Sequence, residues 1–150
     1  MPQPSRHPVV SKYRMQRRVQ FYETDTAGLV HFSWFFRYME EAEHALWRSA
    51  GLSIAPADAK IGFPRVAASF DFHNPLKFED EFEISLSITA ISKKTINYQV
   101  HIIKNDIPIA SGKLTVACVT KQTGRPMKAV NIPKEIVEHF QVAETPNTDQ

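Results

Sequence analysis

Cysteine and glycine are scarce in this 150-residue chain, and each scarcity excludes a class of protein. The one cysteine, Cys118, excludes an internal disulfide and indicates a reducing compartment, so we expect a cytoplasmic location. Its neighbours are apolar, which is typical of a small buried side chain and not of a nucleophile. With five glycines, the sequence contains neither a dinucleotide-binding motif nor a P-loop.

Long apolar runs and a strong net charge are also lacking. No window approaches the apolar length of a membrane span, so we expect no membrane partner. Residues 1–8 lack the apolar core of a secretory signal. The net charge of +2 is too small to indicate nucleic-acid binding. The six histidines show no ligand spacing with cysteine or acidic residues, so neither a metal site nor a cofactor is predicted.

The length and composition are typical of a single soluble domain. Apolar residues make up 43% of the chain and charged residues 23%. Several prolines near the start predict a flexible N-terminal arm over residues 1–12. The polar end predicts a disordered tail over residues 143–150, which leaves one domain over residues 13–142.

A strand, an acidic turn and a long helix are predicted in succession after this arm. Apolar and polar side chains alternate over residues 19–22, as in a half-buried strand. Asp25 and Gly28 are turn residues, and Ser33 is the predicted N-cap of the helix. Apolar residues then recur every three or four positions, giving one apolar helix face: Phe35, Tyr38, Met39, Ala42, Ala45 and Leu46. Gly51 is placed to end the helix in a left-handed conformation.

Antiparallel strands are predicted for most of the remaining chain. The clearest strand is residues 81–89, where every even position is apolar and every odd position is polar. Further strands are predicted over residues 63–75, 96–102 and 107–120. Short turns at 92–94 and at Asn105 and Asp106 make neighbouring strands antiparallel. A short helix follows near Pro133. Periodicity therefore predicts an α+β fold with a mostly antiparallel sheet.

The acidic turn and the start of the helix together have chemical content. The first turn of a helix presents backbone N–H groups without intrahelical partners, and these can polarise a carbonyl oxygen. Asp25 lies just before them, so a carboxylate and an oxyanion-type donor can face one substrate carbonyl. The alternative is a structural aspartate that accepts hydrogen bonds from its own turn.

The same stretch resembles a known family. The run over residues 23–32, followed by the aromatic residues and Arg37 of 35–38 and by 40–42, is similar to the hotdog-fold thioesterases of the 4-hydroxybenzoyl-CoA thioesterase family. The resemblance is densest over residues 17–52 and continues more weakly to Pro133. It implies a hotdog fold, in which an antiparallel five-stranded sheet is wrapped around one long central helix.

The resemblance also implies an activity and catalytic residues. Family members hydrolyse the thioester of an acyl-CoA, with an acid at the position of Asp25 acting as nucleophile or general base. The backbone N–H near Phe32 would bind the carbonyl oxygen. Glu40 is a second candidate acid on the helix, and its alternative is a solvated or ion-paired glutamate beside Arg37 and His44.

Substrate-binding residues follow from the same motif and from local charge. Tyr22, Gly28 and His31 lie in or beside the matched stretch and are candidates for contact with the acyl group. Coenzyme A carries phosphates, which basic side chains at a pocket rim would hold. The candidates for this role are Lys93, Lys94 and Arg125, and the alternative is a solvated basic surface.

Two other functions share some of these features. Hotdog hydratases pair an aspartate with a histidine in a D-x-N-P-x-H element, whereas Asp25 and His31 are separated differently and lack the intervening Asn-Pro. A non-catalytic binder of acyl-CoA or acyl-carrier protein would not require a carboxylate beside the carbonyl.

The aromatic residues predict an assembly of several chains. Ten Phe, four Tyr and two Trp exceed what one small sheet and one helix bury, so we expect a homodimer or homotetramer.

Overall fold

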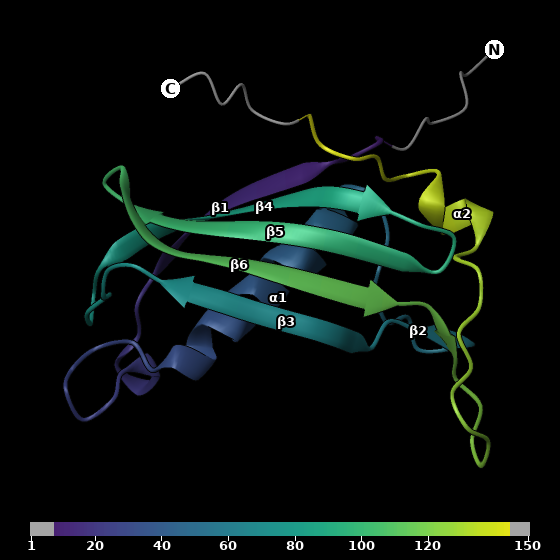
Figure 1. Cartoon of the computed structure of the whole chain (residues 1–150), viewed down its shortest axis with the longest axis horizontal. Coiled ribbons are helices and arrows are strands. Elements are labelled where there is room, and N and C mark those ends of the chain that lie inside the picture. Colours follow the sequence, from purple (N-terminus) through teal and green to yellow (C-terminus); the bar gives the residue numbers. More distant parts are fainter. Residues whose placement is uncertain (1–7, 145–150) are drawn as a thin grey trace.

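The computed structural model describes residues 8–144, which form an antiparallel sheet and one long helix lying across it (Figure 1). The elements are β1 (Lys12–Arg18), the 3-10 helix η1 (Phe21–Glu23), α1 (Phe32–Ser49), β2 (Ile61–Gly62), β3 (Arg65–Phe72), β4 (Glu81–Ile91), β5 (Thr95–Lys104), β6 (Ile107–Ala117), β7 (Val119–Thr120) and α2 (Lys134–Val137). The five main strands follow the order β1-β4-β5-β6-β3, and every neighbouring pair is antiparallel. The predicted α+β class and five-stranded antiparallel sheet are confirmed.

The core lies between α1 and the inner face of β4 and β5. The alternation predicted for residues 81–89 is confirmed in β4, since Phe82, Ile84, Leu86 and Ile88 are all buried. Burying one such side chain contributes about 1.5–3 kcal/mol to folding. Aromatic rings from the helix complete the layer, and the ring centroids of Tyr38 and Phe82 are 4.9 Å apart. The apolar face of α1 is therefore the surface that the sheet covers.

The first strand differs from the prediction. The strand predicted over residues 19–22 is wrong, because Phe21–Glu23 is a 3-10 helix and β1 ends at Arg18. The actual strand is rich in basic residues, and its inward positions include Arg17, whose charge is matched by buried Glu23. A basic side chain on the inner face breaks the apolar alternation from which a strand is read.

The ends of α1 are partly as predicted. Ser33 is not the N-cap, because His31 caps the helix and accepts a hydrogen bond from the Ser33 backbone N–H at 3.3 Å. Gly51 does end the helix in the left-handed conformation, with φ of +78°. The predicted hairpin turn between β5 and β6 is also confirmed, since Asn105 and Asp106 have φ values of +47° and +64°.

The last predicted strand is divided into two elements. β6 pairs with β5 and β3, whereas β7 leaves the main sheet after Cys118 and pairs with β2. Cys118 itself is buried, and burial raises the pKa of its thiol. The side chain is therefore a small core residue, as its apolar neighbours predicted.

The predicted arm and tail lie partly outside the described residues, because residues 1–7 and 145–150 are not described. Next to them, the Val10 N–H donates to the His139 carbonyl at 2.9 Å, and the Gln141 N–H donates to the Val10 carbonyl at 3.0 Å. The domain boundaries at 13 and 142 stay predictions.

Candidate active site

A tight loop holds the carboxylate of Asp25 in front of α1. We call residues 24–30 the Asp25 loop, which Thr24 and Val30 close by an antiparallel bridge. The Asp25 N–H donates to the Leu29 carbonyl at 2.7 Å, and Gly28 turns the chain with φ of +79°. Such a φ strains any residue with a Cβ, which is why glycine suits this position.

The Asp25 carboxylate is anchored through only one of its oxygens. Oδ1 accepts hydrogen bonds from the backbone N–H groups of Ala27 at 2.8 Å and Leu29 at 3.1 Å. Oδ2 accepts none from any residue between 8 and 144. The loop therefore fixes the orientation of the carboxylate and leaves one oxygen available to a ligand.

The start of α1 supplies an unused hydrogen-bond donor. Phe32 is the first helical residue, and its N–H has no acceptor within the described part of the chain. The next two N–H groups are occupied, since Ser33 donates to the His31 ring and Trp34 donates to the His31 carbonyl at 2.9 Å. A free N–H at the positive end of a helix dipole suits a carbonyl oxygen on which charge develops.

A cavity of about 510 Å³ is lined by both residues. Asp25, His31 and Phe32 all line it, so three of the predicted site residues share one cavity. The remaining wall is mainly apolar and is formed by Leu29, Val30, Phe35, Phe72, His73, Asn74, Pro75 and Leu76. A mainly apolar cavity with a few polar groups is typical of small-molecule sites.

The other predicted binding residues do not line this cavity. Tyr22 is 67% exposed, and its ring packs against that of Trp34 with the centroids 5.5 Å apart. Gly28 lies at the tip of the Asp25 loop. Lys93 and Lys94 form the turn between β4 and β5, far from this loop in the fold, and Arg125 lies in the segment after β7 (Figure 1).

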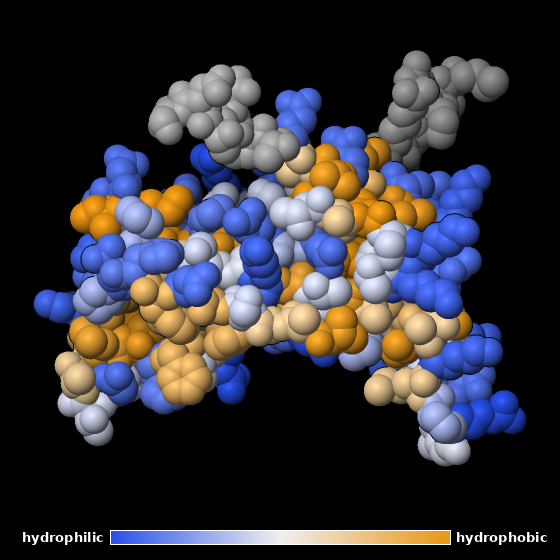
Figure 2. All heavy atoms as spheres, in the orientation of Figure 1, coloured by the Kyte–Doolittle hydropathy of each residue, from blue (hydrophilic) through white to orange (hydrophobic). Residues whose placement is uncertain are grey.

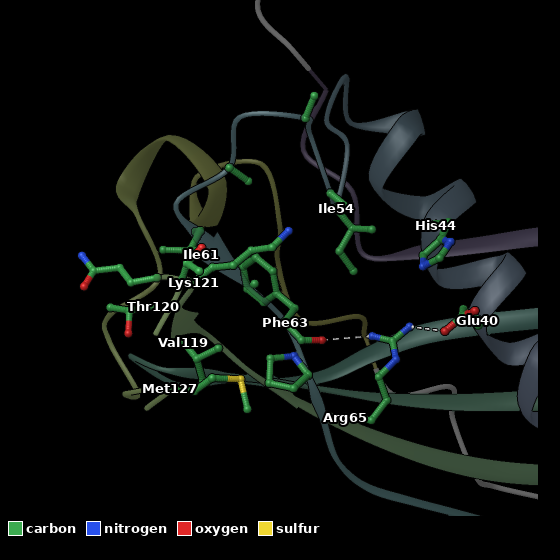
Figure 3. Close-up of a pocket in the computed structure, with 17 residues that line it drawn as sticks. Glu40, His44, Ile54, Ile61, Phe63, Arg65, Val119, Thr120, Lys121 and Met127 are labelled. Atoms are coloured by element: carbon green, nitrogen blue, oxygen red, sulfur yellow. Dashed lines mark hydrogen bonds and ion pairs between the residues drawn. The ribbon is translucent and has the colours of Figure 1, made fainter. Parts of the chain in front are cut away.

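Glu40 lies in a second cavity of about 690 Å³ (Figure 3). Its Oε2 accepts a hydrogen bond from Arg65 Nη2 at 3.0 Å, so the ion-pair partner is a residue of β3 and not Arg37. Arg65 also pairs with Glu43, which is fully buried. This burial raises the pKa of the Glu43 carboxyl. His44 lies beside this group, and burial lowers its pKa.

The core contains charged residues that the sequence did not predict. Glu23 and Glu43 are the buried charged residues of the described chain, and their partners are Arg17 and Arg65. Neither acid interrupts a motif, because each lies beside aromatic or apolar neighbours that already fit an element. A basic residue at an inward position of an alternating stretch, such as Arg17, is the signal that indicates a buried partner.

Comparison with known proteins gives consistent matches. The model of the thioesterase-like superfamily matches residues 19–140. A putative esterase from Aquifex aeolicus is 37% identical over 124 residues, covering 82% of this chain and 93% of its own. The structure of a gentisyl-coenzyme A thioesterase has a TM-score of 0.74 at 31% identity, covering 83% of this chain and 98% of that one.

A more distant structure shares the fold. The 4-hydroxybenzoyl-CoA thioesterase from Pseudomonas sp. strain CBS-3 has a TM-score of 0.78 at 18% identity, covering 87% of this chain and 99% of that one. The predicted hotdog architecture is therefore confirmed. Between residues 8 and 144, no helix is long and apolar enough to cross a membrane.

Proposed function

The chain belongs to the thioesterase-like superfamily, and from this premise we propose that it hydrolyses the thioester bond of an acyl-CoA to a free acid and CoA. The observation that carries the proposal is that one cavity is lined both by Asp25, which has one free carboxylate oxygen, and by Phe32, which has a free N–H. Hydrolysis of a thioester uses both groups. A base or nucleophile acts at the carbonyl carbon, and a hydrogen-bond donor binds the carbonyl oxygen.

Two reaction courses suit this geometry. In the first, Asp25 removes a proton from water, the resulting hydroxide adds to the carbonyl carbon, and the carbon–sulfur bond breaks to release CoA thiolate. In the second, Asp25 Oδ2 attacks the carbon and forms a mixed anhydride with loss of the thiolate, and water then hydrolyses the anhydride. In both courses the Phe32 N–H binds the developing oxyanion. Thiolate is a good leaving group, so neither course requires a strong general acid.

The arrangement of His31 favours hydrolysis over hydration. A hydratase would use a histidine together with the aspartate, but the Nδ1 of His31 contacts Ser33 Oγ at 2.8 Å and caps the helix. A non-catalytic acyl-CoA or acyl-carrier-protein module has no use for a free carboxylate oxygen at the carbonyl. We retain His31 as a substrate contact through its exposed ring edge, beside Tyr22 and Gly28.

The assembly and the phosphate contacts are part of the proposal. β3 is an edge strand with exposed apolar side chains, including Val66 at 59% and Phe72, which also lines the cavity, at 50%. Figure 2 shows apolar side chains gathered along this edge. Exposed apolar strand edges favour pairing with another chain, which supports a homodimer or homotetramer. The proposed contacts to CoA phosphates are Lys93, Lys94 and Arg125, which lie far from the Asp25 loop of the same chain, so we propose a shared site to which a second copy of the chain supplies them.

The test is direct measurement of the products. The purified protein is incubated with a panel of short, long and aryl acyl-CoAs, and released thiol is measured with a thiol reagent. Loss of enoyl-CoA absorbance is followed in parallel. We expect thiol release with at least one acyl-CoA and no change in enoyl-CoA. Enoyl-CoA turnover without thiol release would support a hydratase, and tight binding without either reaction would support the non-catalytic module.

A further inference from the structure

Glu23 is a buried carboxylate two residues before Asp25, and the reaction proposed above gives it no role. Its side chain is 0% exposed, and it lies at the end of η1, between β1 and the Asp25 loop. A buried charge is costly unless it is paired and hydrogen-bonded. The partners of Glu23 therefore indicate which parts of the fold it holds together.

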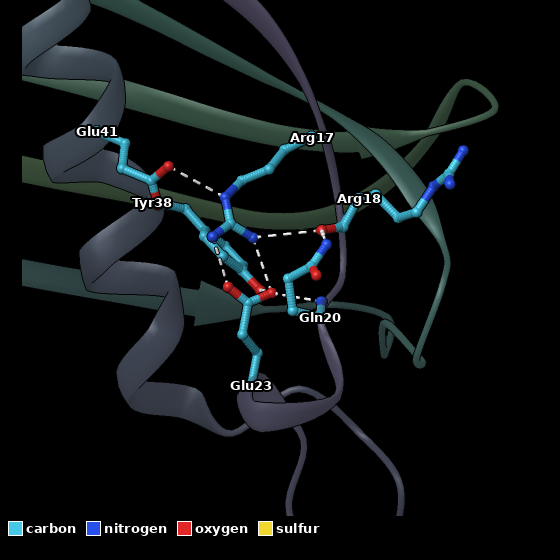
Figure 4. Close-up of polar contacts among 6 residues, drawn as sticks. All are labelled: Arg17, Arg18, Gln20, Glu23, Tyr38 and Glu41. Carbon is cyan, nitrogen blue, oxygen red and sulfur yellow. Dashed lines mark hydrogen bonds and ion pairs between the residues drawn. The ribbon is translucent and has the colours of Figure 1, made fainter.

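Four contacts from three residues converge on this carboxylate (Figure 4). Oε1 accepts hydrogen bonds from Arg17 Nη1 at 2.7 Å, from the Gln20 N–H at 2.8 Å and from the Tyr38 hydroxyl at 2.9 Å. Oε2 pairs with the second terminal nitrogen of Arg17. Arg17 also donates Nε to Glu41 at 3.1 Å, and its guanidinium lies 4.6 Å from the centroid of the Tyr38 ring. The side chain thus links β1, η1 and α1.

The main chain of the same residue contacts the N-cap of α1, which lies beside the Asp25 loop. The Glu23 carbonyl accepts a hydrogen bond from the His31 N–H at 2.8 Å, and His31 is the N-cap immediately before Phe32. Beyond this contact, the Val30 N–H donates to the Leu76 carbonyl at 2.8 Å, Leu29 bridges to Lys77, and the Thr24 N–H donates to the Phe21 carbonyl at 3.1 Å, whereas the hydrogen bonds of Asp25 are internal. Glu23 is therefore the contact that ties the loop directly to the N-cap of the helix.

We propose that Glu23 is a positioning residue that fixes the carboxylate of Asp25 relative to the N–H of Phe32, with Arg17 and Tyr38 as its supports. This inference rests on the proposed thioesterase function. A buried ion pair stabilises a fold no better than apolar packing of the same volume, but its directional contacts define one geometry. Thioester hydrolysis needs such a geometry, because a displacement of about 1 Å at a reacting group can lower the rate by about 10²-fold.

The test compares two buried tyrosines that bond to different parts of the core. Tyr38→Phe removes one donor to Glu23 and keeps the ring on which Arg17 packs. Tyr98→Phe is the matched control, because Tyr98 is 1% exposed and its hydroxyl accepts from Trp47 Nε1 at 3.0 Å, away from the Asp25 loop. We expect Tyr38→Phe to lower kcat about tenfold with KM nearly unchanged. We expect both variants to lower Tm by similar amounts, but Tyr98→Phe should keep kcat within about twofold of wild type.

A second variant and a double variant make the outcome decisive. Arg17→Lys keeps the charge but cannot make the two-pronged contact to Glu23, so it also lowers kcat several-fold. Adding Tyr38→Phe to Asp25→Asn produces no further loss, because positioning acts only through the carboxylate. The inference is overturned if Tyr38→Phe and Tyr98→Phe have equal kcat, or if the double variant loses the product of both effects. Full turnover in Asp25→Asn alone would instead overturn the proposed catalytic role, so the two failures are distinguishable.

Discussion

Gly28 at the tip of the Asp25 loop offers a perturbation whose cost can be worked out from the structure. Its φ of +79° lies in the left-handed region, where a side chain is strained. A Cβ built at this position meets no atom within 4 Å. Gly28→Ala therefore adds backbone strain without a steric clash, and the strain is about 1–2 kcal/mol.

The loop is expected to keep its shape under this strain. The Asp25 N–H, the Gly28 N–H and two N–H groups bonded to Asp25 Oδ1 supply four hydrogen bonds within the loop. At about 1 kcal/mol each, their sum exceeds the strain. The cost therefore appears as lower stability, and for a chain of this length it corresponds to a fall in Tm of about 2–8 °C. Asp25 stays in position, so kcat changes less than about threefold.

Two other glycines provide matched controls for the thermal melts. Gly124 has φ of +77° with no atom within 4 Å of a built Cβ, so Gly124→Ala carries the same strain outside the Asp25 loop and serves as a control for Tm. Gly62 has equal space but no left-handed φ, and Gly62→Ala should leave Tm unchanged or slightly raised. Because we propose that substrate lies against Gly28, Gly28→Ala should raise KM for acyl-CoA by at least about fivefold, whereas Gly62→Ala should not.

Each readout of this experiment can refute a separate step. If Gly28→Ala and Gly62→Ala melt at the same temperature, the left-handed conformation of the loop is wrong. If Gly28→Ala loses stability but has the same KM for acyl-CoA as Gly62→Ala, the proposed substrate contact at Gly28 is wrong. A loss of kcat as large as that of Asp25→Asn would show that the loop hydrogen bonds do not hold Asp25 against the strain.

Three further predictions concern packing, phosphate binding and assembly. Gly112→Ala places a Cβ 2.7 Å from the ring of Phe70, so urea unfolding should show a loss of about 1–3 kcal/mol, and wild-type stability would contradict this packing. Replacing Lys93, Lys94 or Arg125 by Ala should cost about 1–2 kcal/mol in KM for acyl-CoA and leave KM for a pantetheine thioester unchanged. Equal effects on both substrates would place the phosphates elsewhere. Light scattering should give a dimer or tetramer, and a stable monomer at micromolar concentration would count against a shared site.

The parts of the fold governed by simple periodicity were predictable from the sequence. β4 alternates because one face is buried, and its partner β5 follows after a short turn. The single long helix followed from its apolar spacing and from Gly51 at its end. In each case the side chains on one face share one environment, so the spacing of apolar residues predicts the element from local sequence.

The parts governed by contacts between distant residues were not predictable. β1 carries basic residues that are typical of an exposed segment. It pairs with β4, and its inward Arg17 is matched by a glutamate six positions later and by Glu41 on the helix. The partner of Glu40 is Arg65, which approaches through the packing of β3 on α1. Such pairs depend on tertiary distances, and sequence spacing does not contain them.

The candidate site lies between these two cases. The turn chemistry of Asp25 and the free N–H groups at a helix start were expected from local rules, although the helix begins one residue before Ser33. That the Phe32 N–H is free, while the next two are capped by His31, depends on the side-chain conformation of His31. The apolar wall of the cavity also required the fold, because Phe72 and Leu76 come from the end of β3 and the segment after it.

The most direct test of the account is the turnover of Asp25→Asn, measured as thiol release from a good acyl-CoA substrate beside the thermal midpoint of the same variant. Asn keeps an oxygen that can accept from Ala27 and Leu29, so the loop and the Tm should be nearly unchanged. It removes the nucleophile or base, so kcat should fall by about 10²–10⁴ with KM little changed. A folded Asp25→Asn protein that turns over at the wild-type rate would contradict the account and direct attention to Glu40.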